Sequence, residues 1–132
     1  MDITNLENVK KETILIVEDS PSMRKFIALS LKLFGYKVIL AVDGMDALEK
    51  LPGEEISLII TDLNMPNMDG FEFINNIRNI EKYEKLPIIV LSSLTEEDDI
   101  GKSMNLGANT YIIKPFNTQV IQAEVQKLIN KD

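Results

Sequence analysis

Four charged side chains stand directly after apolar segments of the chain. They are Glu18, Asp19, Asp62 and Lys114. Open parallel α/β sheets bind their ligands at the carboxyl ends of their strands, so we expect these four groups to meet on one rim. Three carboxylates and one ammonium leave two net negative charges, which a single divalent cation would neutralise. An aspartate held beside a metal ion and a lysine, as Asp62 would be, is a candidate phosphoryl acceptor.

Five short apolar segments must position these groups, and each is followed by a helical pattern. The segments are continuous rather than alternating, as expected for strands that helices cover on both faces. Five β-α units of this kind predict a parallel sheet with right-handed crossovers. The predicted strands are Ile14–Val17, Val38–Ala41, Leu58–Thr61, Ile88–Leu91 and Tyr111–Ile113.

Capping residues separate these units. Ser20 is expected to cap the first helix, with Pro21 at its first position and Gly35 after its end. The same logic predicts the ends of the later helices at Asp43 or Gly44, Gly53, Thr95, Gly107 and Asn117.

Length and composition limit the function. The 132 residues predict one domain over residues 13–132 behind an N-terminal arm over residues 1–12, with a net charge of −7 and neither cysteine nor histidine. The acidic balance and the lack of a basic stripe argue against nucleic-acid binding. The missing histidine excludes Ser–His and Cys–His hydrolases. No apolar stretch approaches the ~20 residues that span a bilayer and no signal peptide is visible, so we expect a cytoplasmic protein without a membrane segment.

Four ordered motifs resemble the receiver domain of two-component response regulators, most closely the stand-alone chemotaxis (CheY-like) type. They read ILIVEDSPSMR at 14–24, ITDLNMPNMDG at 60–70, LSS at 91–93 and GANTYIIKPF at 107–116. The resemblance covers nearly the whole chain. It implies a flavodoxin-like α/β fold whose five-stranded parallel sheet has the order 2-1-3-4-5, with five helices on its two faces.

The resemblance also implies site roles. Asp62 would accept a phosphoryl group from a phosphohistidine on a partner kinase or from a small acyl phosphate. Asp19, Asp62 and the backbone carbonyl of Asn64 would bind Mg²⁺ directly, and Glu18 would act on the metal through water. Lys114 would stabilise charge on the transferring oxygens. A protein of this type is a phosphoacceptor switch rather than a turnover enzyme.

The remaining implied roles concern switching. Ser92 would move its hydroxyl to the phosphoryl group, and Tyr111 would change rotamer towards the space that Ser92 leaves. A cis Lys114–Pro115 peptide would aim the ammonium into the site. The face made of the fourth helix, fifth strand and fifth helix would then bind a downstream protein target. The implied partners are a histidine kinase, that target and a phosphatase, for a monomer that dimerises at most when phosphorylated.

Two positions depart from the family pattern. Glu18 stands where many members have aspartate, and its longer side chain should reach the metal through water. Leu94 replaces a polar residue that borders the path of the hydrolytic water, which leads to the hypothesis that this leucine cannot position water.

Other functions stay open at this point. A Mg²⁺-dependent phosphatase of the haloacid-dehalogenase type needs a second aspartate two residues after the first, and Asn64 stands there. A flavodoxin-like cofactor module would need a Gly-rich phosphate loop, which does not follow the first strand. A receiver-shaped scaffold that is never phosphorylated is the third alternative. Independently of these alternatives, a purely structural role as a packed strand aromatic is also open for Tyr111, because tyrosine suits strands regardless of switching.

Overall fold

A computed structural model describes residues 11–130 and contains a five-stranded parallel sheet in the order β2-β1-β3-β4-β5. This is the predicted strand order. Every strand lies within one residue of the apolar segment that predicted it. The strands are β1 (Thr13–Val17), β2 (Lys37–Ala41), β3 (Leu58–Thr61), β4 (Ile88–Ser92) and β5 (Thr110–Ile113).

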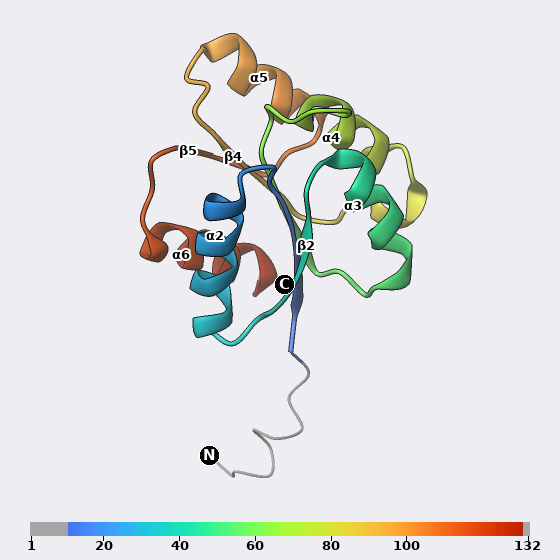
Figure 1. The fold of residues 1–132 in the computed structure, drawn as a ribbon. Coiled ribbons are helices and arrows are strands. Elements are labelled where there is room, and N and C mark those ends of the chain that lie inside the picture. Colours follow the sequence, from blue (N-terminus) through green and yellow to red (C-terminus); the bar gives the residue numbers. More distant parts are fainter. Residues whose placement is uncertain (1–10, 131–132) are drawn as a thin grey trace.

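Five α-helices cover the sheet, two on one face and three on the other (Figure 1). The helices α2 (Pro21–Leu33) and α6 (Thr118–Ile129) share a face. The other face carries α3 (Gly44–Lys50), α4 (Gly70–Arg78) and α5 (Glu97–Leu106). Two short 3₁₀ turns, η1 (Leu51–Gly53) and η2 (Glu81–Tyr83), were not predicted. Within residues 11–130, no helix has the length and apolar character needed to cross a membrane.

The core consists of two apolar clusters, one on each face of the sheet. Successive strand side chains point to opposite faces, so Ile14 and Ile16 pack with α2 and α6, whereas Leu15 and Val17 pack with α3 and α4. All four are buried. Because both faces are covered, the strands need apolar residues at every position, which explains the continuous pattern of the sequence.

Most predicted helix ends are confirmed. Ser20, Asp43 and Asn117 each cap a helix through a side-chain oxygen that accepts a main-chain N–H. Gly35 and Gly107 follow helices with φ values of 99° and 119°, in the left-handed region that favours glycine.

The prediction that Thr95 caps the fourth helix is wrong. Glu96 occupies the cap position of α5, with φ −68° and ψ 137°, and its side chain makes no capping hydrogen bond. The physical reason lies at Leu94, two residues before this cap. The backbone of Leu94 is held at both its N–H and its carbonyl, so the chain turns into the helix one residue later than the capping rule predicts.

Residues 1–10 of the expected N-terminal arm lie outside the described residues, and the domain bounds stay a prediction. Glu12, within the expected arm, already joins the sheet. Its carbonyl accepts the N–H of Lys37 at 3.0 Å, and its carboxylate accepts the hydroxyl of Ser57.

Candidate functional site

The sheet itself positions the predicted site residues. Three of these residues follow directly after a strand, and each is fixed by one main-chain hydrogen bond to the neighbouring strand. Glu18 N–H donates to the carbonyl of Ala41, and Asp62 N–H donates to that of Val17. Lys114 N–H donates likewise to the carbonyl of a β4 residue, at 2.9 Å. The functional groups therefore continue the ladder of parallel strands, and their spacing follows from strand order and register.

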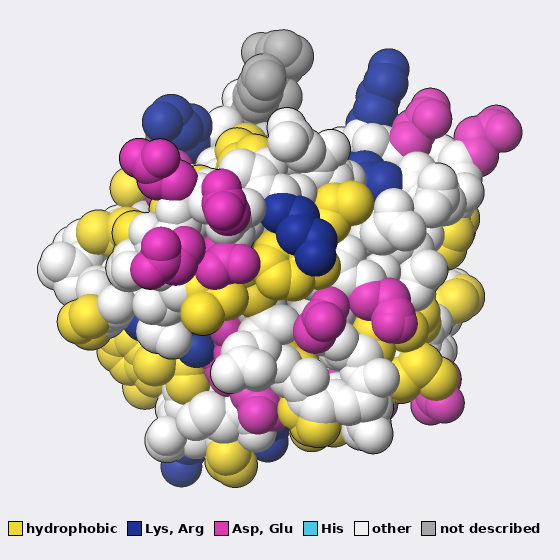
Figure 2. Space-filling model, turned by 90° about the horizontal axis from the view of Figure 1, so that it is seen from above, with side chains coloured by type: hydrophobic (Ala, Val, Ile, Leu, Met, Phe, Trp, Pro, Cys, Tyr) yellow, Lys and Arg dark blue, Asp and Glu magenta, His cyan; other side chains and the backbone are white. Residues whose placement is uncertain are grey.

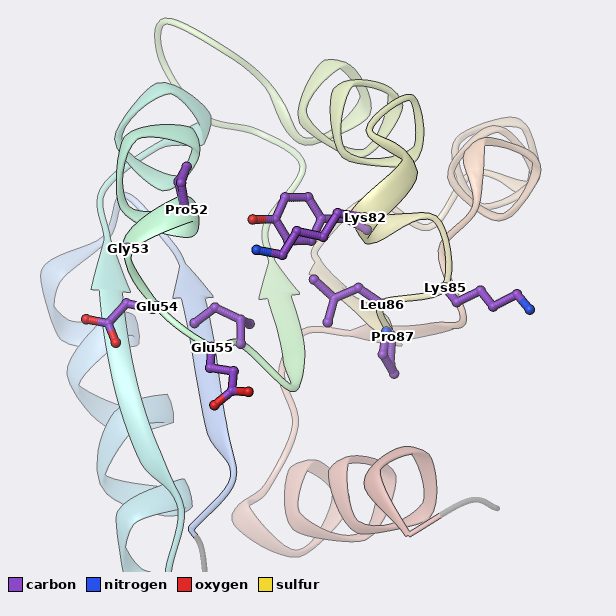
Figure 3. Close-up of a pocket in the computed structure, with 10 residues that line it drawn as sticks. Pro52, Gly53, Glu54, Glu55, Lys82, Lys85, Leu86 and Pro87 are labelled. Carbon is purple, nitrogen blue, oxygen red and sulfur yellow. The ribbon is translucent and has the colours of Figure 1, made fainter.

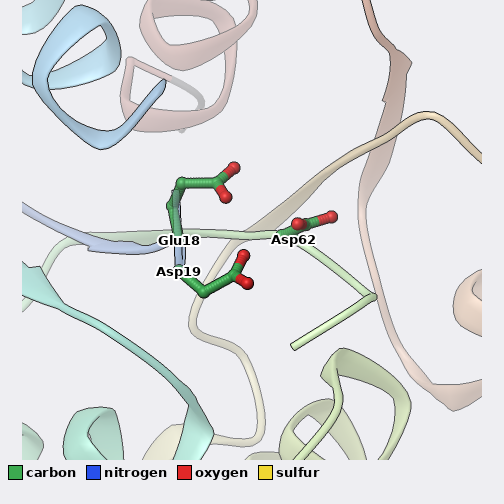
Figure 4. Close-up of side chains that lie close together, drawn as sticks. All are labelled: Glu18, Asp19 and Asp62. Carbon is green, nitrogen blue, oxygen red and sulfur yellow. The ribbon is translucent and has the colours of Figure 1, made fainter. Parts of the chain in front are cut away.

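Three carboxylates meet at the carboxyl edge of the sheet, as predicted. One oxygen from each of Glu18, Asp19 and Asp62 lies within 4.8 Å of the other two. Figure 4 shows the three side chains converging from the ends of β1 and β3. Glu18 and Asp62 are buried, whereas Asp19 is exposed. Seen from above this edge, acidic side chains gather in several groups on a surface that also carries basic, hydrophobic and neutral side chains (Figure 2).

Lys114 supplies the opposite charge. Its Nζ lies 2.9 Å from Oε1 of Glu18 and 3.5 Å from Oδ2 of Asp62. Burial acts to lower the pKa of Lys114, but the hydrogen bond to Glu18 and the nearby carboxylates outweigh it and raise that pKa above its ordinary value. The predicted cis peptide between Lys114 and Pro115 is confirmed.

Glu18 is the most enclosed of the acidic groups, with a relative exposure of 2%. Burial raises its pKa, although the hydrogen bonds from Lys114 and from the N–H of Ser20 act in the opposite direction. Both carboxylate oxygens are engaged: Oε1 accepts from Lys114, and Oε2 accepts from Ser20 N at 3.1 Å. Asp62 has one oxygen held, since its Oδ1 accepts the N–H of Leu63 at 2.8 Å.

The loop after Asp62 is fixed from outside. Asn67 adopts a left-handed φ of 66° and donates from Nδ2 to Oδ2 of Asp43 at 2.8 Å. A side chain on Gly44 would meet Met68 at 2.9 Å, so the loop rests directly on the start of α3. At Gly70, an added Cβ would lie 2.3 Å from the main-chain oxygen of Asp62. The loop can fold back only because that residue is glycine.

The loop after β4 is held through one residue. Leu94 N–H donates to Oγ of Ser92 at 3.1 Å, and the hydroxyl of Tyr111 donates to the carbonyl of Leu94 at 2.7 Å. Ser92 is buried and Tyr111 is half-buried. Among the described residues, no hydrogen bond joins Ser92 to Asp62.

The structure thus gathers Glu18, Asp19, Asp62 and Lys114 at one place. Asn64 lies exposed two residues after Asp62.

Sequence reasoning missed two residues that hold the site. Arg24 donates to the carbonyls of Glu18 at 2.7 Å and of Asp19 at 3.3 Å. Asn67 holds the loop after β3. The signal for Asn67 was its place in a Pro-Asn-Met-Asp turn, since asparagine tolerates left-handed backbone. For Arg24 the sequence offered no local signal, because its partners are main-chain groups.

Fold and site together define a doubly wound α/β protein with an acidic, lysine-bearing rim at its strand ends. Residues 14–126 match the family described as the response regulator receiver domain. The chain therefore belongs to the receiver-domain family, as its motifs predicted.

Two relatives illustrate the range of proteins that it resembles. A chemotaxis protein CheY homolog of Campylobacter jejuni is 33% identical over 118 residues, which are 88% of this chain and 91% of that protein. A probable transcriptional regulator ycf27 of Cyanidium caldarium is 36% identical over 131 residues, covering 99% of this chain. In that case, and in those of two further ycf27 proteins, the chain spans only about half of the relative's length.

Solved structures confirm the flavodoxin-like fold. The chemotaxis protein CheY4 of Vibrio cholerae superposes with a TM-score of 0.86 at 34% identity, over 90% of this chain and 99% of that chain. The receiver domain of sensor histidine kinase PA1611 from Pseudomonas aeruginosa gives a TM-score of 0.85 at 30% identity, over 92% and 100%. That receiver domain has a magnesium ion coordinated in its active site cleft.

Proposed function

We propose that the chain is a phosphorylation-controlled switch in which Asp62 accepts a phosphoryl group. The carrying observation is the juxtaposition at the strand ends: three carboxylates with oxygens within 4.8 Å of one another, and the ammonium of Lys114 at 3.5 Å from Asp62. Phosphoryl transfer uses a nucleophile that lies beside a lysine and beside carboxylates that bind a cation.

The proposed donor is a phosphohistidine on a sensor histidine kinase, or a small acyl phosphate or phosphoramidate. An oxygen of Asp62 attacks phosphorus, with Oδ2 the one on the Lys114 side. The bond from phosphorus to the donor atom breaks, and its electron pair leaves on that atom, which takes a proton from water when it is nitrogen. Lys114 balances charge on the transferring oxygens. Water later hydrolyses the acyl phosphate on Asp62, which returns the carboxylate and releases inorganic phosphate, so the chain acts as a switch and not as a turnover enzyme.

The donor set fits a magnesium ion, because carboxylate and carbonyl oxygens are the hard ligands that Mg²⁺ prefers. Asp19, Asp62 and the main-chain carbonyl of Asn64 are the proposed direct ligands. Glu18 is assigned to the ion through water, since both of its oxygens already accept hydrogen bonds from the protein. When bound, the ion supplies positive charge that stabilises the phosphoryl oxygens.

Ser92 and Tyr111 are the proposed switch residues. If the hydroxyl of Ser92 turns to the phosphoryl group, Leu94 loses one of the two hydrogen bonds that hold its backbone. The face of α5, β5 and α6 then changes its affinity for a protein target. Moving such an equilibrium from 1:99 to 99:1 takes about 5.5 kcal/mol of differential stabilisation. A doubly charged group bonded to Lys114 could supply a good part of it.

The proposed setting is the cytoplasm, and the proposed pathway is chemotaxis or motility signalling. The support for the pathway is that similar proteins of the same length carry chemotaxis names. A monomer that dimerises at most on phosphorylation, a kinase donor, a separate target and a phosphatase complete the proposal.

The test is the intact mass of the protein after incubation with phosphoramidate, with Mg²⁺ or with EDTA. We expect the gain of one phosphoryl group that requires both Mg²⁺ and Asp62, and is lost in Asp62→Asn. Asp69→Asn is the matched control, because it removes a carboxylate from the same loop and keeps a good helix cap. Equal phosphorylation of Asp62→Asn, or none in the unmodified protein, would overturn the proposal. Steady turnover of a phosphate monoester would instead favour the phosphatase alternative.

The hypothesis about Leu94 is testable with the phosphorylated protein. The leucine side chain packs against the apolar cluster of the α3 and α4 face, so it offers nothing to hold a hydrolytic water. Leu94→Glu should therefore raise the rate of autodephosphorylation, measured as loss of the adduct mass after donor removal. An unchanged rate contradicts the hypothesis.

A further inference from the structure

The two flanks of α2 differ in what covers them. On one flank, the hydroxyls of Ser30 and Thr118 lie 3.0 Å apart, and the ring centroids of Phe26 and Phe116 lie 6.0 Å apart with the rings tilted by 40°. That flank is covered by α6 and the loop before it. The other flank faces β2, the edge strand of the sheet, and among the described residues this face carries two helices, α2 and α6.

The open flank forms a groove of about 400 Å³ between α2 and β2. Its apolar floor includes Ala28, Leu29 and Leu40. Leu29 and Leu40 are 56% and 37% exposed, which is high for residues of this size. β2 is an edge strand, so within residues 11–130 no strand pairs with its outer side.

Every charged residue that lines this groove is basic. Arg24, Lys25 and Lys32 line it, and α2 contains no acidic residue over its whole length. This segregation is unusual in a chain with 21 acidic and 14 basic residues. Within residues 11–130, neither Lys25 nor Lys32 has a carboxylate within ion-pair distance. Their charges are therefore available to a partner.

A second hollow shows that the charge pattern of the groove is not general. A cavity of about 590 Å³ lies at the N-terminal ends of β3 and β4, at the edge of the sheet opposite to the carboxylates. Figure 3 shows glutamates on one side of it and lysines on the other. Both acidic and basic residues line that cavity, whereas the charged residues that line the α2–β2 groove are all basic.

We infer that the α2–β2 groove binds an acidic amphipathic helix of a partner protein. Leucine-sized side chains of the helix would cover Leu29 and Leu40, and its flanking carboxylates would pair with Lys25 and Lys32. From Pro21 to Lys32 the groove follows roughly 16 Å of helix, which matches about three turns of an occupant.

The edge of β2 argues for a helix over an added strand. The outward carbonyl of Leu40 already accepts from Nζ of Lys50 at 2.6 Å, and the N–H of Val42 donates to Asp46 at 2.9 Å. Strand addition needs free main-chain groups along an edge, and these two are taken. Side-chain contacts in a groove need none of them.

This surface is separate from the proposed phosphoryl chemistry. Arg24 lines the groove and also donates hydrogen bonds to the carbonyls of Glu18 and Asp19. Binding in the groove should therefore persist in Asp62→Asn, so that failure of one proposal is distinguishable from failure of the other.

The test uses two fluorescein-labelled helical peptides of about twelve residues, with leucines at helical spacing and either glutamates or lysines on the flanks. Fluorescence anisotropy with the full chain should show that the glutamate peptide binds at least about tenfold more tightly than the lysine peptide. Amide chemical shifts should change along α2 and β2. Leu29→Asp should weaken binding at least about tenfold, because it places a carboxylate on the apolar floor.

Leu33→Asp is the matched control, since Leu33 lies on the same helix, is 74% exposed and does not line the groove. It should leave the affinity within about twofold. The double variant Lys25→Glu/Lys32→Glu should reverse the peptide preference. Equal binding of both peptides, shifts confined to another face, equal losses in Leu29→Asp and Leu33→Asp, or no binding would each overturn the inference. Sedimentation that shows Leu29-dependent self-association instead would assign the groove to a second copy of the chain.

Discussion

The two loops that border Asp62 are held in different ways. The loop after β3 is fixed by buried Leu63, Met65 and Met68, by the hydrogen bond from Asn67 and by the close approach at Gly70. The loop after β4 runs over residues 93–96, which are exposed or half-buried, and the hydrogen bonds that join it to β4 and β5 involve Leu94. The helix that follows it, α5, buries only Ser103, whereas α4 buries four residues.

This difference separates the site into a fixed half and a loosely held half. Regions with few buried apolar contacts open at lower free energy than the core does. A phosphoacceptor needs constant geometry, while a surface that responds to its modification needs a small barrier to rearrangement. In the proposed switch, the nucleophile Asp62 and the responding loop would follow neighbouring strands of one sheet, β3 and β4.

The largest expected effect on stability comes from adding a side-chain atom within the tightly packed loop after β3. In Gly70→Ala, the new Cβ would lie 2.3 Å from the main-chain oxygen of Asp62 and 2.7 Å from Cα of Leu63. Main-chain atoms cannot move aside alone, so we expect a loss of about 3 kcal/mol or more in the free energy of unfolding. Urea denaturation followed by circular dichroism measures it.

The control lies in the loosely held half. Gly101 is in the middle of α5, and an added Cβ there meets nothing within 4 Å. Gly101→Ala should stabilise the protein by roughly 0.5–1 kcal/mol, because alanine loses less backbone entropy in a helix. If both variants change stability alike, the contrast between the two halves is wrong.

The next effect tests the outer support of the β3 loop. Asp43→Ala removes the cap of α3 and leaves the Asn67 amide without its acceptor. We expect a loss of about 2 kcal/mol, of which about 1 is the cap. Asp69→Ala removes only a cap, that of α4, and should cost about half as much. Equal losses would mean that the Asn67 bond contributes nothing.

The same contact predicts a pH dependence. The N–H of Asp46 and then the amide of Asn67 hold the pKa of Asp43 below its ordinary value of 3.8. A depressed pKa in the folded state means that the ionised carboxylate stabilises the fold above about pH 4 and that this contribution is lost as the pH falls further. The stability difference between the natural protein and Asp43→Asn should therefore shrink in acid. A constant difference would contradict this assignment.

These residues show which features of the fold and of the site could be predicted from the sequence. Strand order came from the resemblance, and strand positions came from apolar runs that are long and bounded by caps, so both were predictable. Asp43 was predictable as a cap, but its second role depends on Asn67, 24 residues away in sequence and adjacent only after folding. The prediction that Thr95 caps α5 was wrong for a similar reason. Capping propensity is local, whereas the start of α5 depends on where Leu94 is held by Ser92 and Tyr111.

A smaller effect on stability is expected from removing a hydrogen bond that holds the loop after β4. Tyr111→Phe removes the donor to the carbonyl of Leu94 and should cost about 1 kcal/mol. Amide hydrogen exchange should accelerate over residues 93–100 and stay unchanged over residues 63–70. Tyr83→Phe is the control, because the Tyr83 hydroxyl makes no hydrogen bond within residues 11–130. Faster exchange across both loops would show that the two halves are not independent.

The smallest effect comes from repairing the missing cap of α5. Glu96→Ser should add a side-chain hydrogen bond to the first turn and stabilise the helix by roughly 0.5–1 kcal/mol relative to Glu96→Ala, which removes the same charge without capping. Glu97, Asp98 and Asp99 keep the favourable charge at the helix start in both variants. Exchange over the first turn of α5 should slow in Glu96→Ser alone. If the two variants exchange equally, then the looseness of this half comes from its shallow burial and not from its uncapped end.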